Sequence, residues 1–229
     1  MGVSGRLSYS YRFVFITALF ITSILASNIL IVKQIVLFGL TLPAAIVVFP
    51  LSYIFGDVLT EVYGYSQARR VIWLGFFCNL LLVISIWLVG ILPSAPVFDA
   101  QASYERILGN TPRFLIASFA AYLAGEFVNS YIMARMKILT KGKWLWTRTI
   151  TSTVAGEAAD TAIVLLIGFW GVLPPALILA MIFWHWLFKT CYEVIATPLT
   201  YMLVGYLKKA EKLDAYDYGT DFNPLRADR

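Results

Sequence analysis

The stretch FVFITALFITSILASNILIV, residues 13–32, decides the fold class of this chain. It contains no charged residue between Arg12 and Lys33, and 20 predominantly apolar residues are enough to cross a bilayer as one helix. A cleaved signal peptide has a shorter apolar core, of about 7–15 residues. The stretch therefore predicts an uncleaved first transmembrane helix.

The composition of the whole chain agrees with a membrane protein. Of its 229 residues, 60% are apolar and only 14% are charged, whereas a soluble domain carries about 25% charged residues. This composition excludes a soluble enzyme. Cys78 and Cys191 both lie in apolar stretches, so we expect neither a disulfide framework nor a zinc site.

Five further apolar stretches follow the first one, and together they predict an all-α membrane protein with six transmembrane helices in a single domain, residues 1–229. Pro50 interrupts the second stretch and Pro198 the sixth. Because proline lacks a backbone N–H, Pro198 frees the carbonyl of Val194 and predicts a kink. The expected spans are residues 12–32, 42–57, 71–92, 113–134, 149–170 and 178–207.

The distribution of basic residues predicts the orientation in the membrane. If the N-terminus is cytoplasmic, 14 of the 18 basic residues fall in the tails and loops on that side, and three fall on the other. This asymmetry follows the positive-inside rule and places both termini in the cytoplasm. The net charge of +5 is then a signal of topology, and no nucleic-acid partner is expected.

Two segments outside the spans carry structural expectations. In the outer loop, residues 93–112, the stretch from Asp99 to Leu108 is predicted to form a short surface helix. The tail after Leu207 is rich in charged residues, and we expect it to be poorly ordered.

Five charged residues fall within the predicted spans: Glu126, Glu157, Asp160, Lys189 and Glu193. Ionised groups at mid-bilayer cost at least about 2.5–3.5 kcal/mol, so each one needs a reason. Glu157 and Asp160 are three residues apart and share a helix face, whereas Lys189 and Glu193 are four apart and can pair along their helix. Either the acids neutralise a buried base, or the excess of acids over the one lysine faces water, protons or a ligand.

Asp57 and Glu61 lie where the second span meets the cytoplasm. One interpretation is a solvated helix end that pairs with Arg69 or Arg70. The other is a gating or coupling site beneath a helix that is broken at Pro50, as occurs in transporters.

Other polar features leave alternatives open as well. Asn28 and Asn79 form either a hydrogen bond between helices or contacts to a ligand. The pairs Gly56-Asp57 and Gly156-Glu157 occur in the middle helices of the two halves of the chain, which is consistent with a 3+3 inverted repeat.

Four segments carry a resemblance to a known family. They are Ser27–Leu30; FGDVLTEVYG at residues 55–64, followed by Ala68–Arg70; Arg148–Thr153, leading to Gly156-Glu157 and Asp160-Thr161; and Lys189, Tyr192-Glu193 and Thr197–Tyr201. With their joint spacing, they resemble the VUT-type queuosine precursor transporter family over nearly the whole chain.

The resemblance implies a six-helix importer of the inner membrane. Its substrates would be 7-cyano-7-deazaguanine and 7-aminomethyl-7-deazaguanine, the precursors of the tRNA base queuosine. The chain departs from the family pattern in its fourth span, where Glu126 and Asn129 stand in place of the favoured Gln and Asp. The choice between the neutral and the cationic precursor therefore stays open.

The chemistry of a deazaguanine matches these residue types, because a carboxylate can accept two N–H donors from the guanine-like edge. We expect Glu157 or Asp160 to accept from that edge, Lys189 to donate to the base carbonyl and Glu193 to hold Lys189 in place. A cationic aminomethyl group favours a free carboxylate such as Glu126. The expected substrate-binding residues are Asn28, Glu126, Glu157, Asp160, Lys189 and Glu193, with Asp57 and Glu61 in gating or coupling.

Alternatives from other classes stay open. The chain could be the substrate-binding membrane subunit of an ATP-driven vitamin or nucleobase importer, which would require an ATPase partner. An intramembrane enzyme finds no support, because the sequence offers no metal-ligand set or nucleophile–base pair. No catalytic residue, metal or cofactor is expected; the expected partners are a small molecule and the lipid bilayer. The sequence does not indicate the oligomeric state, or whether transport is coupled to protons.

Overall fold

A computed structural model describes residues 9–37, 40–109 and 112–226 of the chain. This part contains six helices that are long and apolar enough to cross a membrane, which confirms the predicted all-α membrane protein. The principal helices are α1 (Tyr11–Leu30), α2 (Phe49–Tyr63), α3 (Tyr65–Gly90), α5 (Pro112–Leu139), α6 (Leu145–Phe169) and α7 (Pro175–Glu211).

The connection between α1 and α2 holds structure that the sequence did not predict. Strands β1 (Gln34–Leu37) and β2 (Leu40–Pro43) form an antiparallel pair, and a short 3₁₀ helix, η1 (Ala44–Val47), follows them. Helix α2 then begins at Phe49, with Pro50 in its first turn. Pro50 therefore starts this helix and does not interrupt it, because the first turn of a helix needs no N–H from that position.

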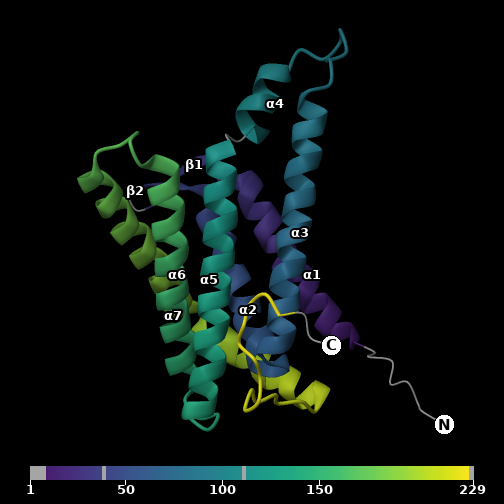
Figure 1. Ribbon diagram of the computed structural model, residues 1–229, viewed down its shortest axis with the longest axis vertical. Coiled ribbons are helices and arrows are strands. Elements are labelled where there is room, and N and C mark those ends of the chain that lie inside the picture. Colours follow the sequence, from purple (N-terminus) through teal and green to yellow (C-terminus); the bar gives the residue numbers. More distant parts are fainter. Residues whose placement is uncertain (1–8, 38–39, 110–111, 227–229) are drawn as a thin grey trace, which may run out of the picture.

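The elements divide between two ends of the helix bundle (Figure 1). The β1–β2 hairpin, the α6–α7 connection and the short helix α4 (Gln101–Leu108) lie toward one end, and α4 confirms the predicted surface helix. The α2–α3 turn, the α5–α6 turn and the C-terminal end of α7 lie at the opposite end, which we call the basic end. The start of α1 is also there, since Ser10 donates a hydrogen bond to Glu211.

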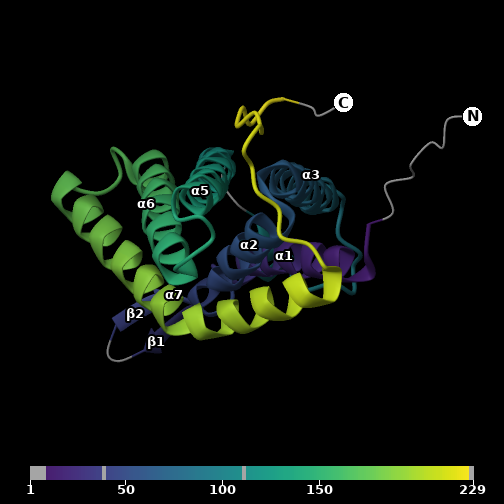
Figure 2. The same cartoon turned by 90° about the horizontal axis from the view of Figure 1, so that it is seen from below.

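Helix α7 is too long to stand upright in a bilayer. Its 37 residues correspond to about 55 Å at 1.5 Å per residue, against a hydrocarbon core of about 30 Å. Figure 2 shows that the helix changes direction between its two halves. Pro198 lies inside this helix, and the bend agrees with the predicted kink.

The tail after α7 is ordered against the basic end, so the expectation of disorder is wrong for residues 212–226. The carboxylate of Asp217 accepts the backbone N–H of Tyr65 at 3.1 and 3.2 Å and thereby caps the start of α3. Arg69 donates to the carbonyls of Asp221 and Asn223, at 3.0 and 2.8 Å. The polar groups of the tail bind helix ends and arginine side chains. The composition of the tail alone does not show these partners, and for this reason its order was not predicted.

Helices α5 and α6 cross closely at two glycines. A methyl group added at Gly156 would lie 2.9 Å from both the carbonyl oxygen of Gly125 and the Cβ of Asn129. Small residues let two helix backbones approach in this way in membranes. Tyr53 of α2 packs on the same crossing and is only 1% exposed, so three helices meet there.

We expect Gly156→Ala to destabilise the protein, because the added methyl group has no free space and the backbones must move apart. Overpacking of this kind costs about 1–3 kcal/mol, which corresponds to a melting temperature lower by roughly 3–10 °C. Thermal unfolding of the purified protein in detergent would measure the change.

Gly205→Ala is the matched control, because a methyl group at Gly205, which lies inside α7 near its C-terminal end, meets open space. It should leave the melting temperature unchanged or raise it. Equal melting temperatures for the two variants would contradict the assignment of Gly156 to a tight crossing.

Candidate functional site

Lys189 of α7 forms ion pairs with two acids of α6. Its Nζ lies 2.7 Å from Oε2 of Glu157 and 2.8 Å from Oδ2 of Asp160. The same ammonium group lies 4.3 Å from the centre of the Phe49 ring of α2, in a cation–π contact. Lys189 therefore links three helices inside the membrane-spanning part of the molecule.

The predicted pairing of Lys189 with Glu193 is wrong. Both carboxylate oxygens of Glu193 are buried and lack a hydrogen-bond partner among the described residues. A pair at i and i+4 on one helix contributes only a few tenths of a kcal/mol, whereas two carboxylates on α6 neutralise the lysine together. Glu193 is therefore free to meet another group.

Asp57 joins α2 to α5. The amide of Asn129 donates to Oδ1 of Asp57 at 2.7 Å, while Oδ2 of Asp57 and Oδ1 of Asn129 have no partner in the described structure. Asp57 and Glu61 are both fully buried, so the interpretation of a solvated helix end is wrong. The sequence places both residues at a span end, but α2 is surrounded by other helices there.

Glu126 of α5 lies against the backbone of α2. The side chain is 1% exposed, and neither of its carboxylate oxygens has a hydrogen-bond partner among the described residues. A Cβ built at Gly56 would lie 3.1 Å from Oε2 of Glu126. Because Gly56 has no side chain, the carboxyl group of Glu126 can lie close to the α2 backbone.

These residues form one cluster, which we call the acidic site. Electrostatic repulsion acts between Glu193 and Asp57, and between Glu126 and the acids Asp57, Glu157 and Asp160. The cluster therefore holds five carboxyl groups and one ammonium group, which pairs with only two of them, and buried acceptors without donors are energetically costly. The acidic site comprises Asp57, Glu126, Asn129, Glu157, Asp160, Lys189 and Glu193.

Asn28 is the one predicted substrate-binding residue that the described structure does not connect to this cluster. Its amide donates to Oδ1 of Asn79 at 2.7 Å and joins α1 to α3. The predicted hydrogen bond between helices is therefore confirmed.

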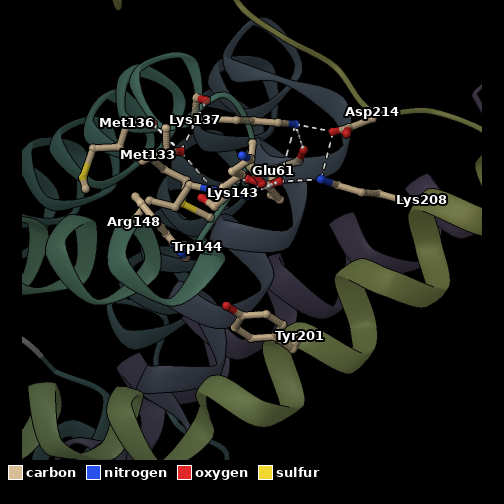
Figure 3. A network of polar contacts seen from close by, with 12 residues as sticks. Glu61, Met133, Met136, Lys137, Lys143, Trp144, Arg148, Tyr201, Lys208 and Asp214 are labelled. Carbon is tan, nitrogen blue, oxygen red and sulfur yellow. Dashed lines mark hydrogen bonds and ion pairs between the residues drawn. The ribbon is translucent and has the colours of Figure 1, made fainter.

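A second buried cluster surrounds Glu61 at the basic end (Figure 3). Nε and Nη2 of Arg148 each donate to the Glu61 carboxylate at 2.8 Å, and Nζ of Lys208 donates to it at 2.5 Å. Lys137 lies 3.5 Å from the same carboxylate and donates to the Glu61 carbonyl at 2.5 Å. One acid thus fixes α5, α6 and α7 to the end of α2.

Asp214 extends this cluster into the tail. It pairs with Lys137 at 2.5 Å and with Lys208 at 2.8 Å. Partial burial acts to raise the pKa of Asp214, but the hydrogen bonds from the two lysines outweigh it and lower the pKa below its usual value. Asp214 therefore stabilises the fold above its ordinary pKa, and this contribution is lost only as the pH falls through the lower folded value. Glu61, Lys137, Arg148, Lys208 and Asp214 form the basic-end network.

Several contributors to the two clusters could not be assigned from the sequence. The charges of Lys137, Arg148 and Lys208 predict orientation but not that they converge on one acid. Nothing in the sequence around Phe49 or Tyr53 distinguishes an aromatic residue of a binding site from one that only packs against its neighbours. Only the arrangement of α2 against α6 and α7 shows their place.

Comparison with known proteins gives a consistent assignment. The family model described as "Putative vitamin uptake transporter" matches residues 43–203. A protein of Bacillus subtilis (strain 168) named "Probable queuosine precursor transporter" is 30% identical over 178 residues, which cover 76% of this chain and 77% of that protein. The "Queuosine precursor transporter" of Escherichia coli (strain K12) is 26% identical over 70% of both chains. No solved structure matches.

We expect Arg148→Lys to destabilise the protein although it keeps the positive charge. Lysine cannot reproduce the two parallel hydrogen bonds to Glu61, and hydrogen bonds to charged groups contribute about 1.5–3 kcal/mol each. The melting temperature in detergent should fall by several degrees. Arg106→Lys on the exposed face of α4 is the control, and a fall of equal size there would argue against a special role for Arg148.

Proposed function

The chain belongs to the vitamin uptake transporter family that its residues 43–203 match, and from that premise we propose that it imports 7-deazaguanine precursors of queuosine. Relatives in two bacteria carry the name of queuosine precursor transporters. The proposed substrates are 7-cyano-7-deazaguanine and 7-aminomethyl-7-deazaguanine, and no catalytic step acts on them.

The excess of buried acceptors in the acidic site is the observation that carries this proposal. Asp57, Asn129 and Glu193 together present four oxygen atoms without a hydrogen-bond donor among the described residues. The guanine-like edge of a deazaguanine supplies N–H donors from its ring and its amino group. A donor-rich, flat ligand therefore completes the site, whereas an acceptor-rich anion would be repelled.

The proposed contacts follow from the position of Lys189. Its ammonium group donates to the base carbonyl, and Glu157 or Asp160, which flank it, accepts from the N–H edge. The Phe49 ring beside Lys189 offers a surface on which a planar base can stack. Glu193, which does not bind Lys189, is available as a further acceptor.

The basic-end network is the proposed gate on the cytoplasmic side. The asymmetry of basic residues supports a cytoplasmic position for this end. Release of a substrate in that direction requires the end of α2 to separate from α6 and α7, and Glu61 holds all three together through Arg148 and Lys208. Asp57 lies one turn before Glu61 on α2 and connects the gate to the acidic site.

Rescue of tRNA modification tests the proposed function. A bacterial strain that cannot make the precursors and lacks its own importer should regain queuosine when it expresses this chain and receives either deazaguanine at nanomolar concentration. Boronate gel electrophoresis detects queuosine by its cis-diol. Absence of queuosine despite good expression in the membrane would contradict the proposal.

We expect Glu157→Gln to lower uptake by about 10–100-fold, because it removes a charge that both positions Lys189 and accepts from the base. Uptake of labelled precursor into cells with matched expression measures the loss. Glu105→Gln, at an exposed acid of α4, is the control and should transport normally. Normal uptake by Glu157→Gln would remove Glu157 from the site.

A further inference from the structure

We propose that Glu126 is the proton-binding group of a proton-coupled importer, so that one proton enters with each precursor. This proposal rests on the import function proposed above. It assigns to Glu126 a role different from the expected contact with a cationic aminomethyl group, and three features of its surroundings support it.

The first feature is the lack of any donor for a deeply buried carboxyl group. Glu126 is 1% exposed, and both of its oxygens are without a hydrogen-bond partner in the part of the chain that the structure describes. The nearby hydroxyl of Tyr122, one turn earlier on α5, donates instead to the carbonyl of Ile72 at 2.8 Å. An ionised carboxylate in such surroundings is strongly disfavoured, and a bound proton removes the charge.

The second feature is the charge of the neighbouring helices. Tyr53 and Asp57 of α2 and Glu157 and Asp160 of α6 lie close enough to Glu126 to interact with it electrostatically. The membrane spans of α1 and α3 contribute no charged residue, since residues 13–32 and 71–97 contain none. Lys189 of α7 is already paired with Glu157 and Asp160. No cation of the described structure is therefore available to Glu126.

The third feature is the lack of room. A Cβ at Gly56 would lie 3.1 Å from Oε2 of Glu126, so the carboxyl group already touches the backbone of α2. An aminomethyl group does not fit between them, whereas a proton needs no added space. Gly56 is next to Asp57 on α2, and Asp57 accepts a hydrogen bond from Asn129 of α5. A charge on Glu126 therefore also affects the packing of α2 against α5.

These features give a simple coupling cycle. With its proton, Glu126 is neutral and allows α2 to pack on α5 beside Asp57, as in this conformation. When the site opens to the cytoplasm, the proton leaves to water and the resulting charge repels Asp57, Glu157 and Asp160. A ligand that binds one of two conformations more tightly shifts the population between them, and the proton acts as such a ligand here.

Two transport assays in proteoliposomes separate coupling from binding. Counterflow exchanges labelled for unlabelled precursor and needs no gradient, whereas net accumulation against a gradient needs a driving force. The probe is 7-cyano-7-deazaguanine, which is neutral, so that the proton is the only charge carried, and equal potassium on both sides with valinomycin holds the membrane potential at zero. With one proton per precursor, a gradient of one pH unit allows accumulation of up to about tenfold.

The wild type should accumulate the precursor when the outside is acidic, and a protonophore should abolish the effect. Glu126→Gln should keep counterflow within about threefold of the wild type but reach an accumulation ratio of only about one. Glu126→Asp, which restores a carboxyl group, should recover part of the accumulation, and Glu105→Gln should match the wild type.

Three outcomes would overturn the proposal. Accumulation by Glu126→Gln equal to that of the wild type would show that the proton binds elsewhere. Loss of counterflow in this variant, while the protein stays folded, would make Glu126 a substrate ligand. A wild type that exchanges the precursor but ignores the pH gradient would exclude coupling and leave the import function intact, whereas a wild type without counterflow would contradict the import function itself.

Discussion

The ion pairs of Lys189 are the interaction on which the rest of the structure depends. In a bilayer, a lone ammonium group and lone carboxylates are both disfavoured, so they draw together the helices that carry them. Lys189 brings α7 to Glu157 and Asp160 of α6, and its contact with Phe49 places α2 against both helices. This arrangement gathers buried polar side chains where the three helices meet.

The same interaction explains why the site has a net excess of acid. A second lysine would reduce this excess and occupy acceptors that a ligand can otherwise use. The protein instead leaves the oxygens of Glu126 and Glu193 without donors within its described part, a state that costs stability in the empty form. Buried polar groups without hydrogen-bond partners are typical of functional sites, because a ligand or a proton provides the missing partner.

The sequence predicted the helices well and the contacts between them less well. The lengths of the apolar stretches predicted six membrane helices, since the thickness of the bilayer constrains them directly. The second expected span, residues 42–57, begins too early, because residues 40–47 form β2 and η1 and α2 runs from Phe49 to Tyr63. The β1–β2 hairpin was missed because it lies mostly in the connection between the first two expected spans, and hydropathy does not separate a short strand from a loop. Lys189 was assigned to Glu193 because spacing along one helix is visible in a sequence, whereas the face that α6 turns toward α7 is not.

Helix α2 places the two clusters one turn apart, and this spacing couples them. Asp57 belongs to the acidic site and Glu61 to the basic-end network, so a rigid shift of α2 changes both sets of contacts together. Four cationic or amide partners from other helices and the close contact of Gly56 with Glu126 hold the helix in the present position. Packed helices move as units between discrete arrangements. A ligand or proton that changes the contacts of Asp57 and shifts α2 therefore also changes the contacts of Glu61, because both residues belong to the same helix. The fold thus needs only one element, α2, to connect substrate binding with the opening of the basic end.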